Sequence, residues 1–172
     1  MQNQSRIIIE NVAPQINCGA IFIKRVLDEE VRVTADVLID GHDILQASIL
    51  HKHQREKKWT ETRMNPTVND EYTASFTPSK QGFYSYKVIG WVDYELNWQH
   101  GIQRKIDDYQ HVNSELLEGA YLLEQLKKEL SKEDKAYVSH LISIFKSKDA
   151  YNEAIKEATS KRLHSLFVKH PQ

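Results

Sequence analysis

The spacing of two histidines is the feature of this sequence that comes nearest to a metal-binding pattern. His51 and His53 lie two positions apart in a segment with strand-like periodicity, so their side chains point to the same face. Imidazole is a common zinc ligand, but a zinc site in a protein needs a third and usually a fourth ligand. His42 or Asp43 would supply it only if folding brought them close, and the sequence contains no HExxH or CxxC motif. We therefore expect no metal and no other cofactor.

Catalytic patterns are equally weak. The string Asp40-Gly41-His42-Asp43 combines acids with a histidine, but turn formation explains the same residues, because glycine accepts positive φ and aspartate caps its own backbone. There is no GxSxG motif, and Cys18 has no histidine near it in the sequence. Composition cannot select a pair of glycosidase carboxylates from 24 acidic residues. We predict that this chain alone is not an enzyme.

Three tryptophans offer a binding chemistry instead. The indole ring can stack on the apolar face of a sugar, and its N–H can donate a hydrogen bond to a hydroxyl. The candidates for carbohydrate stacking are Trp59, Trp91 and Trp98. The commoner use of such residues is structural: Trp91 lies in a strand-like segment rich in Phe and Tyr, and Trp98 can anchor the first helix. The exposure of the rings distinguishes the two interpretations.

A change of hydrophobic period near Asp93 divides the elements that must position these residues. Before it, segments with strand-like character lie at residues 6–12, 31–39, 45–49, 72–76 and 83–92 and around Trp59. The turn at residues 40–43 predicts a hairpin between two of them. Six or seven antiparallel strands predict an immunoglobulin-like β-sandwich over residues 1–93, without a disulfide to join its sheets.

Residues 94–172 are rich in Leu, Ala, Glu, Lys and Gln, which predicts a C-terminal helical region packed on the sandwich. The expected N-cap residues are Ser114, Ser131, Asp149 and Ser160. Leucines from Leu116 to Leu130 form one apolar stripe, which is most often core but can also bury against another subunit. The interface candidates are Leu116, Leu117, Ala120, Tyr121 and Leu123.

Charge and composition narrow the classes of partner. The 172 residues include 23 basic and 24 acidic side chains, and this net charge of −1 argues against nucleic acid as a partner. The first six residues do not resemble a secretory leader, and no apolar run approaches the roughly 20 residues of a membrane helix. A single cysteine forms no intrachain disulfide. We expect a cytoplasmic protein that does not enter a membrane.

Six short strings are informative together through their order and spacing. They are Arg6-Ile7-Ile8-Ile9-Glu10-Asn11-Val12, Ile23-Lys24-Arg25-Val26, Ala35-Asp36-Val37 with Asp40-Gly41-His42-Asp43, Phe76-Thr77-Pro78, Gly90-Trp91-Val92-Asp93 with Trp98, and Leu116-Leu117-Glu118-Gly119-Ala120. With them the chain resembles the amino-terminal domain of the alpha-1,4-glucan:maltose-1-phosphate maltosyltransferases, amylase-like enzymes of glycoside hydrolase family 13. The likeness runs from Arg6 to Pro171, and none of the strings is a catalytic motif.

The resemblance implies a division of tasks within a longer polypeptide. In that family a sandwich with appended helices lies ahead of the (β/α)₈ barrel, which carries the catalytic carboxylates, and contributes to a homodimer interface. The barrel would follow residue 172 and is absent from this sequence. We therefore expect a non-catalytic accessory and dimerisation domain, whose partners are that barrel and a second subunit. The alternative is a glycan-binding module for α-glucan that uses exposed tryptophans.

Overall fold

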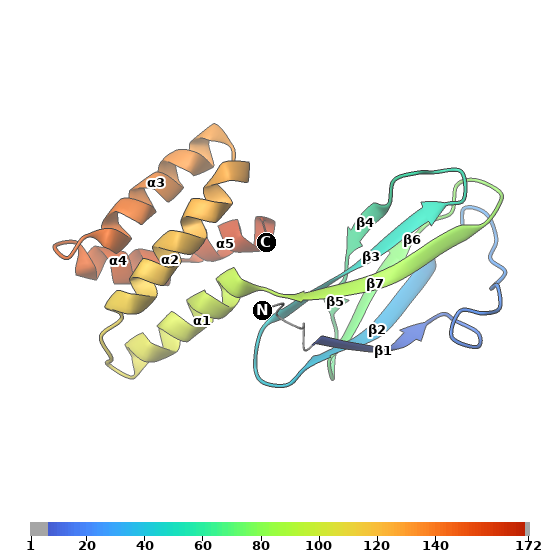
Figure 1. Ribbon diagram of the computed structural model, residues 1–172, viewed down its shortest axis with the longest axis horizontal. Coiled ribbons are helices and arrows are strands. Elements are labelled where there is room, and N and C mark those ends of the chain that lie inside the picture. Colours follow the sequence, from blue (N-terminus) through green and yellow to red (C-terminus); the bar gives the residue numbers. More distant parts are fainter. Residues whose placement is uncertain (1–6, 171–172) are drawn as a thin grey trace, which may run out of the picture. The chain divides into compact units, whose positions relative to one another are not determined.

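The computed structural model describes residues 7–170, in which antiparallel sheets are followed by helices (Figure 1). Contacts divide the chain into two compact units, Met1–Val92 and Asp93–Gln172. The general prediction of strands followed by helices is confirmed. Arg6, where the first strand was predicted to begin, and Pro171, where the resemblance ends, lie outside the described residues. No helix of the described part is long and apolar enough to cross a membrane.

The strands of the first unit form two antiparallel sheets. One has the order β1-β2-β6-β5 and the other the order β4-β3-β7. The strands are β1 (Ile7–Ala13), β2 (Val31–Ile39), β3 (Leu45–His53), β4 (Thr60–Arg63), β5 (Asn65–Pro66), β6 (Glu71–Phe76) and β7 (Tyr84–Val92).

Both sheets contribute one face to a single apolar core. Alternate residues of β2, from Val31 to Val37, are at most 5% exposed, and Ala47 and Ile49 of β3 are fully buried. Their cluster also includes Tyr72 and residues of β7 with the same alternation. Burial of each large aliphatic side chain contributes about 1.5–3 kcal/mol, so the period of two fixes which face of each strand turns inward.

The predicted hairpin between residues 31–39 and 45–49 is wrong. β2 pairs with β1 and β6, whereas β3 pairs with β4 and β7, so residues 40–44 lead from one sheet to the other. Both strands bury alternate residues in the shared core, and this alternation is the same whether or not two consecutive strands pair. The turn was therefore recognised, but its partners could not be read from periodicity.

The second unit consists of helices around a core of its own. The helices are α1 (Tyr94–Asp107), α2 (Asn113–Leu126), η1 (Lys127–Glu129), α3 (Lys132–Lys146), α4 (Tyr151–Ala158) and α5 (Lys161–Lys169). One face of α2, from Leu116 to Leu126, packs in this core with Val138 and Leu141 of α3. The helical stripe of the sequence is thus largely intramolecular.

Two of the expected helix caps are confirmed. The hydroxyl of Ser131 accepts from the backbone N–H of Asp134, and that of Ser160 accepts from Leu163. Each cap satisfies one of the unpaired N–H groups of a first helical turn, which contributes about 1 kcal/mol.

The other two caps were placed wrongly by one or two residues. α2 has Val112 as its N-cap and α4 has Ala150, and neither helix has a side-chain cap bond. Ser114 therefore lies inside the first turn of α2, where its hydroxyl donates to the Glu115 carboxylate. Asp149 precedes the cap of α4. Helix boundaries shift easily by this amount when tertiary packing decides the first turn.

Trp98 joins α1 to the other helices of its unit. Its ring lies against Phe145 and Phe167, with centroid separations of 5.8 and 6.1 Å. Its indole N–H donates to the backbone carbonyl of Glu115 at 2.6 Å. A Cβ added to Gly119 of α2 would overlap the indole ring, so the glycine is required by this packing.

The substitution Gly119→Ala is therefore expected to destabilise the helical unit by about 1–3 kcal/mol, because overpacking exceeds the gain in helix propensity. The matched control is Gly101→Ala in α1, where an added Cβ would meet no atom within 4 Å. That control should be neutral or stabilising by up to about 1 kcal/mol. Urea unfolding followed by circular dichroism measures both, and equal effects of the two substitutions would contradict the packing described.

Candidate functional site

The β1–β2 connection and the β6–β7 turn border a cavity of about 1010 Å³ in the first unit. The course of these two segments can be followed in Figure 1. Its walls are mainly apolar and aromatic, and they include Phe22, Phe76, Phe83, Tyr84 and Tyr86. Small-molecule sites in proteins have volumes of about 300–1,000 Å³ and similar walls. This cavity is therefore the candidate binding site of the strand unit.

An exposed aromatic pair marks the cavity. Phe22 from the β1–β2 connection and Phe83 from the residue before β7 have ring centroids 4.8 Å apart and planes inclined by 46°. The side chain of Phe22 is 76% exposed, and Phe83 is also exposed. Water contacts much of both rings, so a ligand that covered them would gain hydrophobic free energy.

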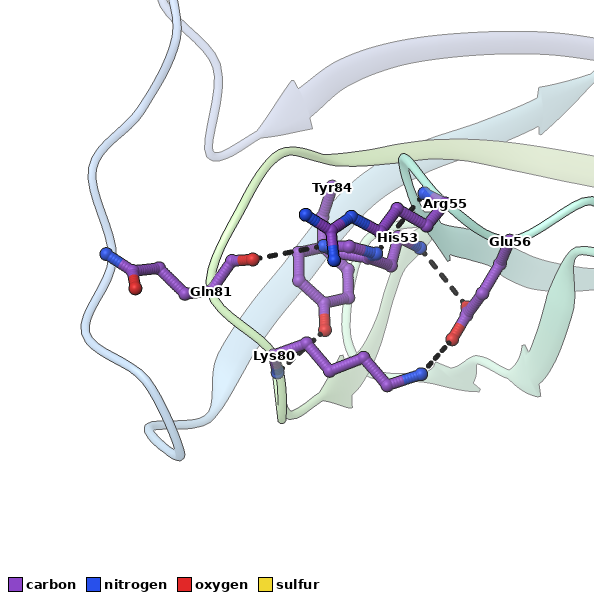
Figure 2. Close-up of polar contacts among 6 residues, drawn as sticks. All are labelled: His53, Arg55, Glu56, Lys80, Gln81 and Tyr84. Carbon is purple, nitrogen blue, oxygen red and sulfur yellow. Dashed lines mark hydrogen bonds and ion pairs between the residues drawn. The ribbon is translucent and has the colours of Figure 1, made fainter.

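His53, at the end of β3, contacts the β6–β7 turn that borders the cavity (Figure 2). Its Nδ1 accepts from the backbone N–H of Arg55 at 3.2 Å, and its Nε2 is 3.2 Å from the carbonyl oxygen of Gln81. The ring therefore fits the neutral tautomer that carries its proton on Nε2 and donates to Gln81. The ring also meets Tyr84 edge-on, with centroids 5.0 Å apart.

Gly82 is required beside this histidine. Its φ of +138° is one that side chains disfavour, and an added Cβ would lie 2.6 Å from His53 Nε2. The backbone of the β6–β7 turn can approach the imidazole only because this residue lacks a side chain. Phe83, the next residue, is positioned by that close approach.

Glu56 and Lys80 complete the polar network (Figure 2). The carboxylate of Glu56 accepts from Lys80 Nζ at 2.8 Å and from the backbone N–H of His53 at 3.3 Å. The Lys80 ammonium holds the pKa of Glu56 below its ordinary value, and the carboxylate raises the pKa of Lys80. The backbone N–H of Lys80 donates to the Tyr84 hydroxyl at 3.1 Å, which ties the turn to β7.

The two histidines considered as metal ligands have separate structural contacts. Both ring nitrogens of His53 take part in the hydrogen bonds above, and the His51 ring stacks on Phe76 at a centroid distance of 4.4 Å. Burial lowers the pKa of His51, and the nearby charge of Glu56 opposes this effect in part. Within residues 7–170 no group of three or more His, Cys, Asp and Glu side chains is arranged to hold a metal.

The three tryptophans lie in different environments. Trp98 is 6% exposed, and a sugar would reach its ring only if the helical core opened. Trp59 is 38% exposed just before β4, with the ammonium groups of Lys52 and Lys87 at 4.7 and 5.2 Å from its ring centroid. Trp91 is half-buried on β7, with the Arg63 guanidinium 4.3 Å from its ring centroid.

Trp59 and Trp91 belong to the outer face of the β4-β3-β7 sheet. Trp91 lies opposite Gln46 of β3. Because the neighbouring Leu45 and Ala47 point into the core, Gln46 and Trp91 point to the other face of the sheet. Trp59 precedes Thr60, which lies opposite His51, so the two tryptophans are about six β3 residues apart. Six residues of a strand span roughly 20 Å. The sheet therefore presents two cation-flanked indoles on one face.

The five interface candidates divide into two groups. Leu116, Ala120 and Leu123 are at most 3% exposed and belong to the core of the helical unit. Leu117 and Tyr121, one turn apart on α2, are 56% and 60% exposed. A helix buries only one side against its own unit, so the first three side chains cannot reach a partner and the other two can.

Sequence reasoning missed the cavity. Phe22 and Phe83 lie outside the strands, and Gln81, the partner of His53 in the β6–β7 turn, is 28 residues further along the chain. The one available signal was a phenylalanine directly after Gly82 in a turn. That pattern indicates a special backbone conformation but does not predict its neighbours.

A family model described as alpha-1,4-glucan:maltose-1-phosphate maltosyltransferase, domain N/S, matches residues 5–172. The proteins most similar in sequence include alpha-1,4-glucan:maltose-1-phosphate maltosyltransferases from several organisms. The one from Salinibacter ruber is 35% identical over 149 residues, which is 85% of this chain and 22% of that protein. The one from Chlorobaculum tepidum is 31% identical over 97% of this chain and 25% of that protein. The family resemblance inferred from the sequence is confirmed, and the chain spans about a quarter of these curated relatives.

His51 is expected to make folding stability depend on pH. Because its pKa is lower in the folded state, the unfolded chain binds more protons near the ordinary histidine value of about 6.5, and stability falls as pH decreases through that value. The substitution His51→Phe keeps a ring against Phe76 and removes this titration. Urea unfolding between about pH 7.5 and 5.5 should show a smaller loss of stability for this variant than for the wild type.

The control for this measurement is His100→Gln, which removes an exposed histidine from α1. Its stability is expected to follow pH as the wild type does. Identical pH dependence in the wild type and His51→Phe would show that the folded environment of His51 does not disfavour its protonation.

Proposed function

The chain belongs to the alpha-1,4-glucan:maltose-1-phosphate maltosyltransferase family, and from this premise we propose that it is a non-catalytic accessory domain of a larger maltosyltransferase. The observation that carries this proposal is the match of residues 5–172 to domain N/S, while the same residues cover about a quarter of the relatives. The complete polypeptide would transfer maltosyl units from maltose 1-phosphate to an α-1,4-glucan. Its catalytic groups would belong to an amylase-like (β/α)₈ barrel of glycoside hydrolase family 13.

The side chains of the described residues support a non-catalytic role. In the polar network around His53, the imidazole nitrogens of His53 and the carboxylate of Glu56 hold two turns and the end of a strand. The Asp40-Gly41-His42-Asp43 string is an exposed turn between sheets. Both constellations that resembled chemistry in the sequence therefore have structural tasks.

The finer architecture is part of the same proposal. Two antiparallel sheets that share one core, without a disulfide among the described residues, are consistent with an immunoglobulin-like sandwich over residues 1–93. Residues 94–172 would be its helical extension. We place the enzyme in the cytoplasm, where a free Cys18 needs no partner.

Dimerisation is proposed to use the outer face of α2. Leu117 and Tyr121 expose apolar surface one helical turn apart, over a buried row that fixes the helix in its unit. A second copy of the same face would cover both side chains in a two-fold interface. Tyrosine is a favourable residue there because its ring buries apolar area while its hydroxyl keeps a polar contact.

The double substitution Leu117→Ser, Tyr121→Ser in the complete enzyme is expected to weaken the dimer, because central interface side chains contribute about 2 kcal/mol or more each. Light scattering across a dilution series measures the dissociation constant. The matched control is Val168→Ser, which changes an exposed apolar side chain on α5. A dimer that stays as stable as the wild type would remove α2 from the interface, and a monomeric wild type would remove dimerisation from the proposal.

The placement of Trp59 and Trp91 favours glycan binding as a second candidate function. The two indoles lie on one face of a sheet, at a spacing that a short linear glucan can bridge. An exposed polar side chain lies between them, that of Glu61, whose carboxylate accepts from the buried Ser48 hydroxyl at 2.8 Å. Aromatic rings and hydrogen-bonding groups in one row are the usual means of binding a saccharide.

For this second candidate, titration with maltoheptaose is expected to quench tryptophan fluorescence in the wild type. Trp59→Ala and Trp91→Ala should each weaken binding about three- to tenfold, the equivalent of one stacking contact. Trp98 provides an internal reference, because its buried ring remains in both variants. Unchanged emission up to about 10 mM ligand would dispose of the glycan-binding alternative.

A further inference from the structure

The cavity beside the β1–β2 connection has no role in the proposed assembly, and the charged residues that line it are all basic. The cations among its lining residues are Lys24, Arg25 and Lys80. None of the described residues that line it is an aspartate or a glutamate. A cavity with cations and without carboxylates favours an anionic ligand.

Two of the three cations are available to such a ligand. Lys80 is paired with Glu56 at 2.8 Å, so much of its charge is compensated. Lys24 and Arg25 are exposed, and no carboxylate of residues 7–170 forms an ion pair with either. The guanidinium of Arg25 donates to the backbone carbonyl of Lys24 at 2.9 Å and keeps further N–H groups for a second acceptor.

The walls suit a molecule with flat apolar faces. Phe22 and Phe83 form an inclined pair, and Phe76, Tyr84 and Tyr86 form a second aromatic group with centroid separations of 6.1–6.3 Å from Phe76. Pyranose rings have one face of C–H groups that packs on aromatic rings. Phe76 is buried in the core, so the exposed pair of Phe22 and Phe83 is the part of these walls that can receive a sugar ring.

The hydroxyl groups of the cavity favour a saccharide over a hydrocarbon as its ligand. The Tyr84 hydroxyl accepts from the backbone of Lys80 and so keeps its own proton for donation. The Tyr86 hydroxyl donates to the carbonyl of Pro14 and so keeps its lone pairs. A saccharide can pair with the Tyr84 proton and the Tyr86 lone pairs, whereas a hydrocarbon chain would cover both hydroxyls and leave this remaining capacity unused.

We propose that this cavity binds a phosphorylated saccharide, with its sugar rings against Phe22 and Phe83 and its phosphate on Lys24 and Arg25. The choice of maltose 1-phosphate as the member of this class rests on the proposed function, because that function makes it a substrate of the complete enzyme. The site lies in the strand unit and would give this unit its own affinity for the donor. Arginine is suited to the phosphate because its planar N–H groups bind two oxygens together.

Isothermal titration of the 172-residue chain with three ligands tests the proposal. Maltose 1-phosphate combines sugar and anion, maltose has only the sugar, and inorganic phosphate has only the anion. We expect maltose 1-phosphate to bind with a Kd of about 1 mM or tighter, and each of the other two at least about tenfold more weakly.

Two variants locate the binding in the cavity. Arg25→Gln should weaken binding of maltose 1-phosphate about tenfold and leave the weak binding of maltose unchanged. Phe22→Ala should weaken both saccharides and leave phosphate unchanged. Both residues are exposed, so neither substitution disturbs the core, and the matched control Lys156→Gln removes an exposed cation of the helical unit without effect.

Three outcomes would overturn the proposal. They are no heat from maltose 1-phosphate, equal affinity for maltose and its phosphate, or equal losses in Arg25→Gln and Lys156→Gln. A failure here is distinct from failure of the assembly role, because the latter is measured by light scattering on variants of α2 in the other unit.

Discussion

The burial of one face of each strand in a shared apolar core is the constraint on which the strand unit depends. Alternate apolar residues of β2 and β3 enter this core, with Val33, Ala47 and Ile49 fully buried, although the two strands belong to different sheets. Because inward positions are taken by the core, every second residue is left for the outer faces. Trp59 and Trp91 stand on such an outer face, so the same alternation that stabilises the fold also places two aromatic rings where a ligand can reach them.

A second constraint acts at the edge of this core, where connections rather than strands form the surface. His53 is fully buried and is held by hydrogen bonds at both ring nitrogens, and Gly82 allows the β6–β7 turn to close on it. The turn in consequence presents Phe83 beside Phe22 of another connection. A polar network with few apolar contacts can define a cavity in this way because each of its hydrogen bonds is directional.

Periodicity predicted the order of elements well and their pairing poorly. Strands at 31–39, 72–76 and 83–92 and the caps Ser131 and Ser160 follow from local rules of alternation and hydrogen bonding. The pairing of β2 with β1 and β6 depends on contacts between distant residues, which a local turn at Gly41 cannot specify. The candidate cavity could not be predicted for the same reason, because it is bordered by two connections that have no hydrophobic periodicity. The tryptophans were found by residue type, but only burial separated Trp98 from the other two.

The helical unit shows why an accessory role and an apolar stripe are compatible. The side chains of Leu116, Ala120 and Leu123 on α2 are buried in the core of the helical unit. Gly119 on the same helix packs against the Trp98 ring. An apolar residue that remains outside, such as Leu117, costs solubility in an isolated unit unless another surface covers it. Because the buried row holds α2 in a fixed orientation, association of the outer pair costs side-chain rotamer freedom but no further ordering of the helix backbone. A surface of this kind favours association through a prearranged helix face.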